Sequence, residues 1–368
     1  MEGIVIKKLL IGYIQDGKHS GIDKYLLNFC TVCYENNVKA DFLTDKITSD
    51  MMEYMQDMGF GLIEVPSLKK PVLQYKAIKK IIKSNGYDGV YANISESFNC
   101  MLPLAAKKCG VPVRIVHSHS SGVDRANKLS RTIRTFLNSV FRCVLNKCAT
   151  KKYACSSVAG KWLYSDSNFE IIYNAVNKER FGFNSDIRLK KRKQFNLTDK
   201  HILIHIGNFC YQKNNYFLMD IMAQVKKRDK NAVLLSVGTG SDFDGVIKYA
   251  KSLGIDDSVK FLGVRDDVPD LLSTADVFVF PSRFEGLSIT CIEAQISGLK
   301  CIFADTLSKE TKISDNVEFI PLGSAEKWAE TVINNIGPRT QGQIYPEQIK
   351  NYDISHQKEQ LCGIIKGL

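Results

Sequence analysis

The chain has 368 residues, of which 44% are hydrophobic and 24% are charged, and its formal net charge at pH 7 is +11. This composition is typical of a soluble globular protein and excludes a disordered or fibrous chain. No run of about 18 apolar residues predicts a transmembrane helix, and the N-terminus, with an acid at Glu2 directly before an apolar pattern, does not resemble a signal peptide. The length predicts two domains, and we expect a cytoplasmic protein.

Eleven cysteines are scattered along the chain without a repeated spacing. Cys30 and Cys33 lie three residues apart within a helical pattern, and no second pair accompanies them. A zinc site is therefore not expected. Free, buried thiols in a reducing cytoplasm are the better interpretation.

In the first half of the chain, apolar runs that are typical of buried parallel strands alternate with helical patterns. The runs are Ile4–Ile14, Ala40–Leu43, Gly61–Val65, Gly89–Ala92, Val113–His117, Tyr153–Cys155 and Glu170–Ile172. Helical patterns lie between them, for example at Gly21–Glu35 and Val72–Lys83. The alternation predicts an α/β domain built on a parallel sheet.

Two stretches of this half are basic and contain no acid, Val65–Tyr87 and Arg125–Ser165. The second also has apolar residues at helical spacing, from Leu129 to Leu145. Such a helix can lie on an anionic membrane surface, or its charges can be the solvated face of an ordinary packed helix. Nucleic acid is not favoured, because no recognisable binding motif accompanies the charge.

Two places at the ends of predicted strands are candidates for ligand binding. Ser20 and Gly21 form a small-residue turn at a helix start, which suits a phosphate or an acceptor but is also an ordinary helix cap. His117 and His119 end the run Val113–Val116, where they can bind a substrate or transfer protons. A metal pair is not predicted there, because no third ligand lies nearby in the sequence.

The connection between two domains is predicted from the loss of periodicity after Ile172. Tyr173–Asn184 contains several turn formers, and the basic segment Arg188–Lys193 follows it. The predicted division is a first domain at residues 1–173, a second at 174–350, and a terminal helix at 351–368 that packs back toward the first domain.

A second alternating series follows this connection. Its strand-like runs are His201–Ile206, Ala232–Val237, Val259–Leu262, Val277–Phe280 and Cys301–Ala304, with helical patterns near Asn215–Lys226, Phe243–Leu253, Val268–Ser273 and Thr290–Ser297. We expect two doubly wound domains that bind ligand at the carboxyl edges of their strands, facing a shared central cleft.

The loop after the first strand of this series suits a phosphate. Gly207 lets the backbone turn close to a ligand, and Lys213 stands just before a helix start, where it can hold a phosphate as a point charge. Taken alone the pattern is weak, since lysines near helix starts are common surface residues.

The segment from Val277 to Ala304 reads as strand, loop, helix and strand, with Glu285 at the strand edge and Glu293 two turns along the helix. The helix start beside Gly286 offers backbone N–H groups to a phosphate. Two acids beside an anion site suit a sugar nucleotide, although by themselves they are also compatible with a general acid and base pair.

Other ligand motifs are missing from the sequence. Gly238-Thr239-Gly240 lacks the spacing of a dinucleotide fingerprint, which disfavours a nicotinamide enzyme. No carboxylate pair stands at a strand end where it would hold a metal and a diphosphate, and Asp266-Asp267 more plausibly starts a helix.

With these residues assembled, the chain resembles the family 4 retaining glycosyltransferases of GT-B fold. The segment FEGLSITCIE resembles their Glu-x7-Glu motif, Gly207 to Lys213 resembles their phosphate loop, and FLGVRDDVPDLLSTADVFVFPS resembles their base-binding loop and the helix after it. IVHSHS resembles the strand of their catalytic histidine, and IIYNAVN resembles their hinge. The resemblance covers nearly the whole chain and is nearest to the bacterial branch that builds capsular polysaccharides and exopolysaccharides.

The resemblance implies a role for each matched residue. Glu293 would hold the ribose hydroxyls, Glu285 the hydroxyls of the donor sugar, and His117 would contact the sugar near the reacting carbon, with His119 as the reserve choice. The diphosphate would lie on the phosphate loop and helix start, and the base beside Arg265. The residues that would bind the diphosphate are Gly207, Asn208, Lys213, Gly286, Leu287 and Ser288, and Ser20 and Gly21 would lie near a phosphate or the acceptor.

The sequence departs from the family at three places. Asn208 stands where the family usually has arginine, Ser20-Gly21 where it often has Gly-Gly, and Tyr173-Asn174-Ala175 at the hinge. Loss of one charged contact to the diphosphate would cost about 1.5–3 kcal/mol.

The resemblance therefore implies a metal-independent, retaining hexosyltransferase without a cofactor. The donor would be a nucleotide-sugar, with UDP as the expected nucleotide. The acceptor would be a polysaccharide or a lipid-linked oligosaccharide, bound by the first domain, with the enzyme peripheral at the inner face of the cell membrane. Two alternatives stay open: a non-catalytic sugar-nucleotide-binding subunit of a transferase, and a UDP-sugar epimerase of the same two-domain shape.

Overall fold

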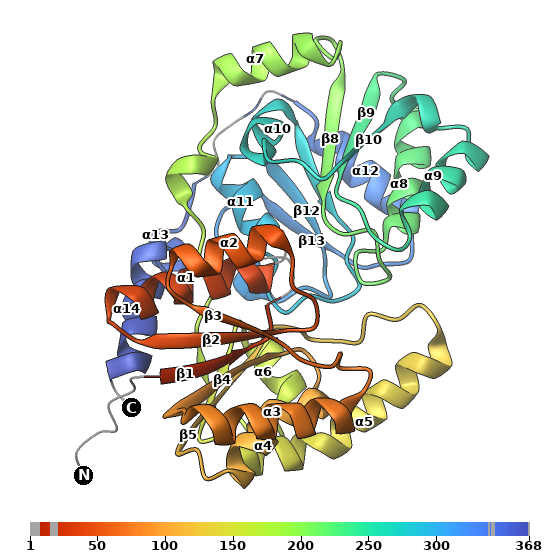
Figure 1. Cartoon of the computed structure of the whole chain (residues 1–368). Helices are drawn as coiled ribbons and strands as arrows, with labels where there is room; N and C mark the ends of the chain where they lie inside the picture. Colours follow the sequence, from red (N-terminus) through yellow and green to blue (C-terminus); the bar gives the residue numbers. More distant parts are fainter. Residues whose placement is uncertain (1–7, 15–20, 338, 340–342, 367–368) are drawn as a thin grey trace. The chain divides into compact units, whose positions relative to one another are not determined.

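The computed structural model describes residues 8–14, 21–337, 339 and 343–366. These residues form two compact units. The first contains the described residues up to Val123, Asn127–Ala175 and the described residues from Ile354 onward, and the second contains Asp124–Ala126 and Val176–Asp353. Both units are α/β (Figure 1).

The first unit is built on a seven-stranded parallel sheet in the order β3-β2-β1-β4-β5-β6-β7. Its strands are β1 (Lys8–Gly12), β2 (Lys39–Thr44), β3 (Gly61–Glu64), β4 (Gly89–Ile94), β5 (Val113–Ser118), β6 (Lys151–Ala154) and β7 (Glu170–Ile171). Its helices are α1 (Gly21–Glu35), α2 (Ser49–Asp57), α3 (Pro71–Asn85), α4 (Met101–Lys108), α5 (Lys128–Cys148), α6 (Ser157–Leu163) and α14 (Ile354–Lys366), with a 3-10 turn at Ser97–Asn99.

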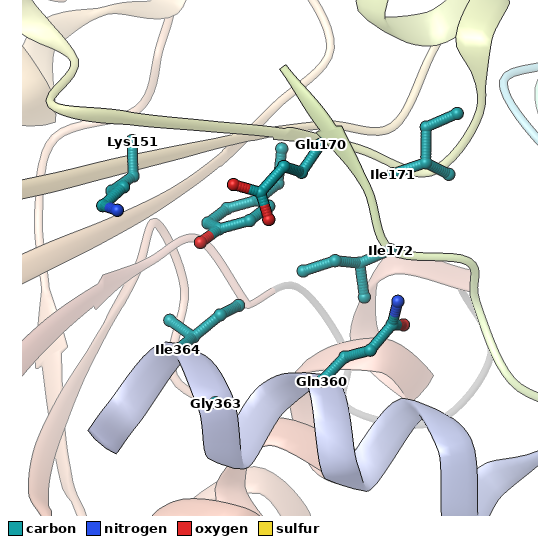
Figure 2. A pocket seen from close by; sticks show the side chains of 8 residues that line it. Lys151, Glu170, Ile171, Ile172, Gln360, Gly363 and Ile364 are labelled. Carbon is teal, nitrogen blue, oxygen red and sulfur yellow. The ribbon is translucent and has the colours of Figure 1, made fainter. Parts of the chain in front are cut away.

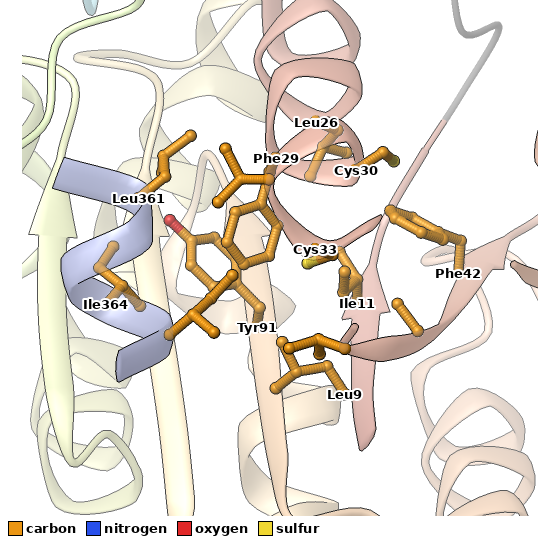
Figure 3. Close-up of a cluster of buried hydrophobic side chains, with 14 of the residues drawn as sticks. Leu9, Ile11, Leu26, Phe29, Cys30, Cys33, Phe42, Tyr91, Leu361 and Ile364 are labelled. Atoms are coloured by element: carbon orange, nitrogen blue, oxygen red, sulfur yellow. The ribbon is translucent and has the colours of Figure 1, made fainter. Parts of the chain in front are cut away.

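Alternate residues of β1 supply two different cores, one on each face of the sheet. Leu9 and Ile11 belong to the core that α1, α2 and α14 cover, whereas Leu10 belongs to the core that α3 and α4 cover. Figure 3 shows the first of these cores, in which Leu361 and Ile364 of α14 lie beside side chains of α1 and the central strands. The last helix of the chain is thereby part of the first unit.

Helix α5 is attached to the first unit by polar and apolar side chains. Asn138 is fully buried, accepts the backbone N–H of Ser97 at 2.6 Å, and donates to the carbonyl of Trp162 at 3.0 Å. Arg134 forms an ion pair with Glu96. On the opposite side of the helix, four apolar side chains face solvent: Leu129, Ile133, Phe136 and Val140. Further along the helix Leu145 is buried in the core, and Phe141 and Val144 pack against it. The sequence left open a membrane-bound helix and a packed helix with a solvated basic face, and both stay predictions.

The second unit is built on a six-stranded parallel sheet in the order β10-β9-β8-β11-β12-β13. Its strands are β8 (His201–Ile206), β9 (Ala232–Val237), β10 (Val259–Gly263), β11 (Val277–Phe280), β12 (Lys300–Ala304) and β13 (Val317–Ile320). Its helices are α7 (Ser185–Gln194), α8 (Asn215–Arg228), α9 (Phe243–Ser252), α10 (Val268–Thr274), α11 (Ile289–Ile296), α12 (Ala325–Asn335) and α13 (Pro346–Lys350), with 3-10 turns at Lys178–Phe181, Asp256–Ser258 and Lys309–Thr311.

The basic segment Arg188–Lys193, predicted as part of an interdomain connection, is instead helical and lies within α7. Its position is fixed by Asp276, a buried carboxylate that pairs with Arg188 at 2.5 Å and with Arg192 at 2.7 Å. The same carboxylate accepts the backbone N–H of Ile202 at 2.7 Å, which joins α7 to the start of β8. Pairing with a buried carboxylate, rather than a lack of structure, explains Arg188 and Arg192 of this basic run.

Each apolar run that the sequence predicts as a strand corresponds to a strand of the structure. The first run, Ile4–Ile14, is described only from Lys8 and ends at Gly12 as a strand. The sequence analysis did not single out α2, α12 or β13. Within the described residues, no helix combines the length and the apolar content that crossing a membrane requires.

Candidate functional site

The candidate site of the second unit lies at the carboxyl ends of β8 and β11. These strands are neighbours in the sheet, and the strand order reverses between them. In open α/β sheets, ligands bind outside the carboxyl ends of the strands at such a switch point. The loop from Gly207 to Asn214 follows β8, and the loop from Pro281 to Ser288 follows β11.

The loop after β8 is held by hydrogen bonds to the loop after β9. Gly207 N donates to Val237 O at 3.0 Å, and Phe209 N donates to Thr239 O at 2.9 Å. A Cβ atom at Gly238 would lie 2.1 Å from Gly207 O, so only glycine allows this close approach. The Gly-Thr-Gly sequence therefore supports the loop that the sequence predicts to bind phosphate.

Lys213 and Glu285 meet in this site. The Lys213 Nζ atom lies 2.7 Å from Glu285 Oε1, and Gln212 Nε2 donates to Glu285 Oε2 at 2.9 Å. Glu285 is 7% exposed, and the Lys213 ammonium also lies 4.7 Å from the centre of the Phe280 ring. The structure thus brings together two residues that lie far apart in the sequence.

Asp124 supports the same loop. Asp124 lies in the segment Asp124–Ala126, which belongs to the second unit. Its Oδ1 accepts the backbone N–H of Gln212 at 2.9 Å. The Gln212 carbonyl in turn accepts the backbone N–H of Arg283 at 2.8 Å. These bonds fix the backbone on either side of the Lys213–Glu285 pair.

Helix α11 begins directly after this pair. Its N-cap is Ser288, whose side chain makes no capping hydrogen bond, so the amides of the first turn and the positive end of the helix dipole are not capped by that hydroxyl. Gly286, Leu287 and Ser288 are buried at this helix start. Glu293 lies on α11 and is 6% exposed. A phosphate at this helix start would meet the helix dipole and the Lys213 ammonium together.

His205 is a residue of this site that the sequence interpretation missed. Its Nδ1 donates to Val279 O at 2.9 Å, and its Nε2 would lie 3.4 Å from a Cβ atom at Gly207. Burial lowers the pKa of His205 to about 4, and the Lys213 charge acts in the same direction, so the ring is neutral. The signal in the sequence was a histidine within an apolar strand, two residues before Gly207.

Asn208 and Arg265 take different positions around the site. Asn208 is exposed in the loop after β8. Arg265 makes two hydrogen bonds of 2.7 Å to Asp267, and these bonds together with Lys191 hold the pKa of the Asp267 carboxyl well below its usual range. The guanidinium that is predicted to lie beside the base is thus engaged by a neighbouring carboxylate. Asp267 is also the N-cap residue of α10, as its predicted place at a helix start requires.

The candidate residues of the first unit lie around the ends of β4 and β5. His117 is fully buried, and its Nδ1 lies 3.0 Å from the Tyr91 hydroxyl, which itself lies 2.6 Å from the Tyr25 hydroxyl. His119 is only half-buried, and its Nε2 donates to Asn93 Oδ1 at 2.8 Å. The two histidine rings are 4.2 Å apart.

Both histidines are neutral at physiological pH. Burial lowers the pKa of His117 well below its usual range, with a further contribution from His119, and burial lowers the pKa of His119 to about 3. His119, rather than His117, keeps an exposed edge. Gly21 begins α1, whereas Ser20 lies outside the described residues. The assignments of all these residues to substrate stay predictions.

A cavity of about 270 Å³ in the first unit lies away from these strand ends (Figure 2). It is lined by Lys151 and Glu170, the first residues of β6 and β7, and by Gln360 of α14. Its lining also includes Tyr153 and Ile172, so the cavity lies between the edge strands β6 and β7 and helix α14. Among the described residues, no three His, Cys, Asp or Glu side chains are grouped as a metal site, and the eleven cysteines are free.

Comparison with known proteins finds matches among glycosyltransferases. Residues 186–336 match the model of the family described as glycosyl transferases, group 1. The chain is 28% identical over 342 residues to the putative glycosyltransferase EpsF of Bacillus subtilis, covering 89% of this chain and 87% of that protein. It is 24% identical over 283 residues to the UDP-Gal:alpha-D-GlcNAc-diphosphoundecaprenol alpha-1,3-galactosyltransferase of Escherichia coli, covering 74% of this chain and 70% of that protein.

The fold is shared with solved structures. The crystal structure of Anabaena HepE in complex with UDP and glucose superimposes with a TM-score of 0.78 at 18% identity, covering 99% of this chain and 100% of that one. The match spans the whole of both chains and so includes both parallel-sheet units described above. The chain is therefore a glycosyltransferase of GT-B fold, and its residues 186–336 match the group 1 glycosyl transferases.

Proposed function

We propose that this glycosyltransferase moves a hexose from a UDP-sugar to a polysaccharide or a lipid-linked oligosaccharide, with retention of the anomeric configuration. The observation that carries the proposal is the buried Lys213–Glu285 pair beside the start of α11, at the switch point of the second sheet. The site combines a cation and a helix N-terminus for a diphosphate with a carboxylate for sugar hydroxyls. The relatives support the choice of ligands, because one is named for UDP-Gal and a diphospholipid acceptor.

Donor binding would rearrange the pair. In the structure the Lys213 ammonium neutralises Glu285 at 2.7 Å. A diphosphate at the start of α11 would attract the same ammonium, which leaves the carboxylate oxygens of Glu285 to accept hydrogen bonds from the donor sugar. With the donor bound, Lys213 would pair with the phosphate, and hydrogen bonds from the sugar and from Gln212 would satisfy the Glu285 oxygens.

The chemistry of the transfer would depend on positioning and charge. As the bond from the sugar to the diphosphate breaks, negative charge grows on the leaving phosphate, where Lys213 and the α11 dipole stabilise it. The proton of the acceptor hydroxyl would pass to the leaving phosphate on the same face of the sugar. Since these groups supply the positive charge, the proposed reaction needs no metal ion or other cofactor.

We also place the enzyme at the inner face of the cell membrane. All eleven cysteines are free, which suits a reducing compartment. An acceptor carried on a membrane lipid is reached most readily by an enzyme that binds the membrane surface. The product would be a capsular polysaccharide or exopolysaccharide, as the sequence resemblance implies.

The test is a transfer assay with purified protein, a panel of UDP-sugars and a membrane extract. We expect transfer that is insensitive to EDTA, a product with the anomeric configuration of the donor by NMR, and a loss of rate of about a hundredfold in Glu285→Ala. The matched control is Glu318→Ala, which removes an exposed carboxylate of β13 bonded to Asn335 and should not change the rate.

Three outcomes would contradict the proposal. An unchanged rate in Glu285→Ala would remove the site assignment, and an inverted product would remove retention. UDP binding without transfer to any acceptor would favour the alternative of a donor-binding subunit, for which Asn208 gives a structural reason. The epimerase alternative is not carried further, because the family is one of glycosyltransferases.

A further inference from the structure

The helices on one face of the first unit are strongly basic. By sequence, α3 carries four lysines, α4 two and α5 five lysines or arginines, and none of the three contains Asp or Glu. The helices α1, α2 and α14, which cover the other face, carry six acidic and three basic residues. The positive charge of the first unit is thus concentrated on the helices of one face.

The same face exposes large apolar side chains. On α5, Leu129 is 70% exposed and Phe136 is 67% exposed, and Ile133 and Val140 lie on the same stripe. Their spacing of three and four residues places all four on one side of the helix. On α3, Val72 is 65% exposed. A surface helix ordinarily turns its apolar side to the core, so this outward stripe needs a partner.

An apolar groove of about 470 Å³ continues the stripe into the body of the unit. It is lined by Leu68 and Tyr75 from the α3 side, by Met101 and Leu104 of α4, and by Leu137 and Phe141 of α5. Because Leu137 follows Ile133 by one helical turn, the groove and the exposed stripe adjoin each other.

We propose that this α3–α5 surface, defined by the stripe, the groove and the exposed lysines around them, binds an anionic lipid bilayer. Lys69, Lys70, Lys76 and Lys80 lie at or in α3, and Lys128 and Lys147 at the two ends of α5, all exposed. The lysines would contact lipid phosphates, while the stripe enters the boundary of the hydrocarbon and the groove takes part of an acyl chain.

The charges decide between a bilayer and other partners. Two copies of the chain could not pair through this face without opposing helices that carry basic and no acidic residues. Nucleic acid would leave the apolar stripe exposed, since protein surfaces that bind nucleic acid are more polar than other interfaces. A bilayer with anionic headgroups satisfies both the lysines and the apolar side chains.

The test is co-sedimentation of the full chain with vesicles of phosphatidylcholine, with and without phosphatidylglycerol. We expect binding to the anionic vesicles only, weakening as salt rises. The double variant Ile133→Ser/Phe136→Ser should lower the partition coefficient about tenfold or more, because two apolar side chains no longer enter the hydrocarbon boundary. Lys76→Gln/Lys80→Gln should also lower it about tenfold at low salt.

The matched control is Tyr34→Ser, which removes a side chain of α1 that is 60% exposed on the other face of the sheet. It should bind vesicles like the unchanged protein, and all variants should keep the same thermal unfolding midpoint, since exposed side chains are replaced. In Phe136→Trp, the indole fluorescence should be quenched by lipids brominated on the acyl chain.

Several results would overturn the proposal. They are equal binding to neutral and anionic vesicles, no binding to either, and equal losses in Tyr34→Ser and the stripe variant. A concentration-dependent dimer that the stripe variant abolishes, in a protein that does not bind vesicles, would assign the face to a second copy instead.

The membrane surface deepens the proposed location of the enzyme, but the vesicle assay measures no sugar transfer and so is independent of the proposed reaction. Glu285→Ala should bind vesicles like the unchanged protein, and the stripe variant should keep UDP binding. Failure of the membrane surface and failure of the transferase proposal are therefore distinguishable.

Discussion

Asn208 is the residue at which a single side chain is expected to limit the affinity for the donor. It is exposed in the loop after β8, close in sequence to Lys213, and it carries no charge. In the proposed site Lys213 is the cation beside the start of α11, and the family resemblance implies a second cation at position 208.

We predict that Asn208→Arg raises the affinity for UDP about tenfold. A charged hydrogen bond to a phosphate contributes about 1.5–3 kcal/mol, which is somewhat reduced by exposure to water. Isothermal titration calorimetry with UDP measures the change. Asn231→Arg, an exposed substitution in the loop before β9, is the control for a general effect of added charge. An affinity equal to that of the control would show that position 208 does not face the phosphates.

His205 should affect how the stability of the protein depends on pH, because its ring is buried in the neutral form. Burial lowers its pKa to about 4 in the folded protein, against about 6.5 in an unfolded chain. The folded state therefore disfavours the proton. Above pH 6.5 the ring is neutral in both the folded and the unfolded chain, and its contribution to the free energy of unfolding is complete. As the pH falls from 6.5 toward 4, the unfolded chain takes up the proton first, so this contribution is lost.

We predict that His205→Asn makes the loss of stability in acid less steep. Asn cannot be protonated in this range and places an amide donor where Nδ1 donates to Val279 O. The slope between pH 6 and pH 4 should fall by up to about 1.4 kcal/mol per pH unit, the contribution of one proton. Urea unfolding at a series of pH values measures it, with His356→Asn on the partly exposed side of α14 as the control. Equal slopes in the two variants would contradict the assignment.

At the scale of elements, α5 shows what the pattern of the sequence could not decide. Its apolar spacing correctly predicts a helix, and the observed helix is Lys128–Cys148. Which side faces inward depends on Asn138, whose partners Ser97 and Trp162 come from other parts of the chain. The apolar periodicity indicates that the helix is amphipathic, but the neighbouring segments that pack against it determine which side is buried.

We predict that Asn138→Ala destabilises the first unit by about 1–3 kcal/mol, because it leaves the buried Ser97 N–H without this acceptor. Urea unfolding followed by the fluorescence of Trp162, whose carbonyl also loses a partner, measures the change. Ser139→Ala, an exposed substitution at the next position of α5, should change the free energy of unfolding by less than about 0.5 kcal/mol. A similar effect of both substitutions would mean that the buried amide does not anchor the helix.

The site of the second unit was more predictable than the position of α5, for a physical reason. The family resemblance placed Lys213 and Glu285 on the same donor, and the parallel pairing of β8 with β11 brings the loops that carry them together. The support by Asp124, and the place of His205 beneath Gly207, depend on contacts between distant segments that no local pattern contains.

At the scale of the whole molecule, the chain returns to the first unit after completing the second. Leu361, Ile364 and Ile365 of α14 are buried in the core that contains Leu9 and Phe29, as Figure 3 shows for its labelled members. Asn28 of α1 also donates to Gln357 at 2.8 Å. The stability of the first unit therefore depends on residues at the far end of the chain.

We predict that Leu361→Ala destabilises the first unit by about 2–5 kcal/mol, as expected for a fully buried leucine. In this variant, hydrogen exchange of the backbone amides should be faster in β1 and β4, while the amides in the strands of the second unit keep their protection. Glu359→Ala on the exposed side of α14 is the control. Loss of protection confined to α14 itself would contradict the role of this helix in the core.

The sequence by itself determined the alternation of strands and helices, the α/β class and the residues that gather at the strand edge of the second unit. These features follow from local periodicity and from the rule that parallel strands share one ligand-binding edge. The tertiary structure decided which side of α5 faces outward, that His117 is more deeply buried than His119, and that the basic residues of α7 are paired with a buried aspartate. Burial and pairing are properties of contacts between distant residues, and those contacts exist only once the chain has folded.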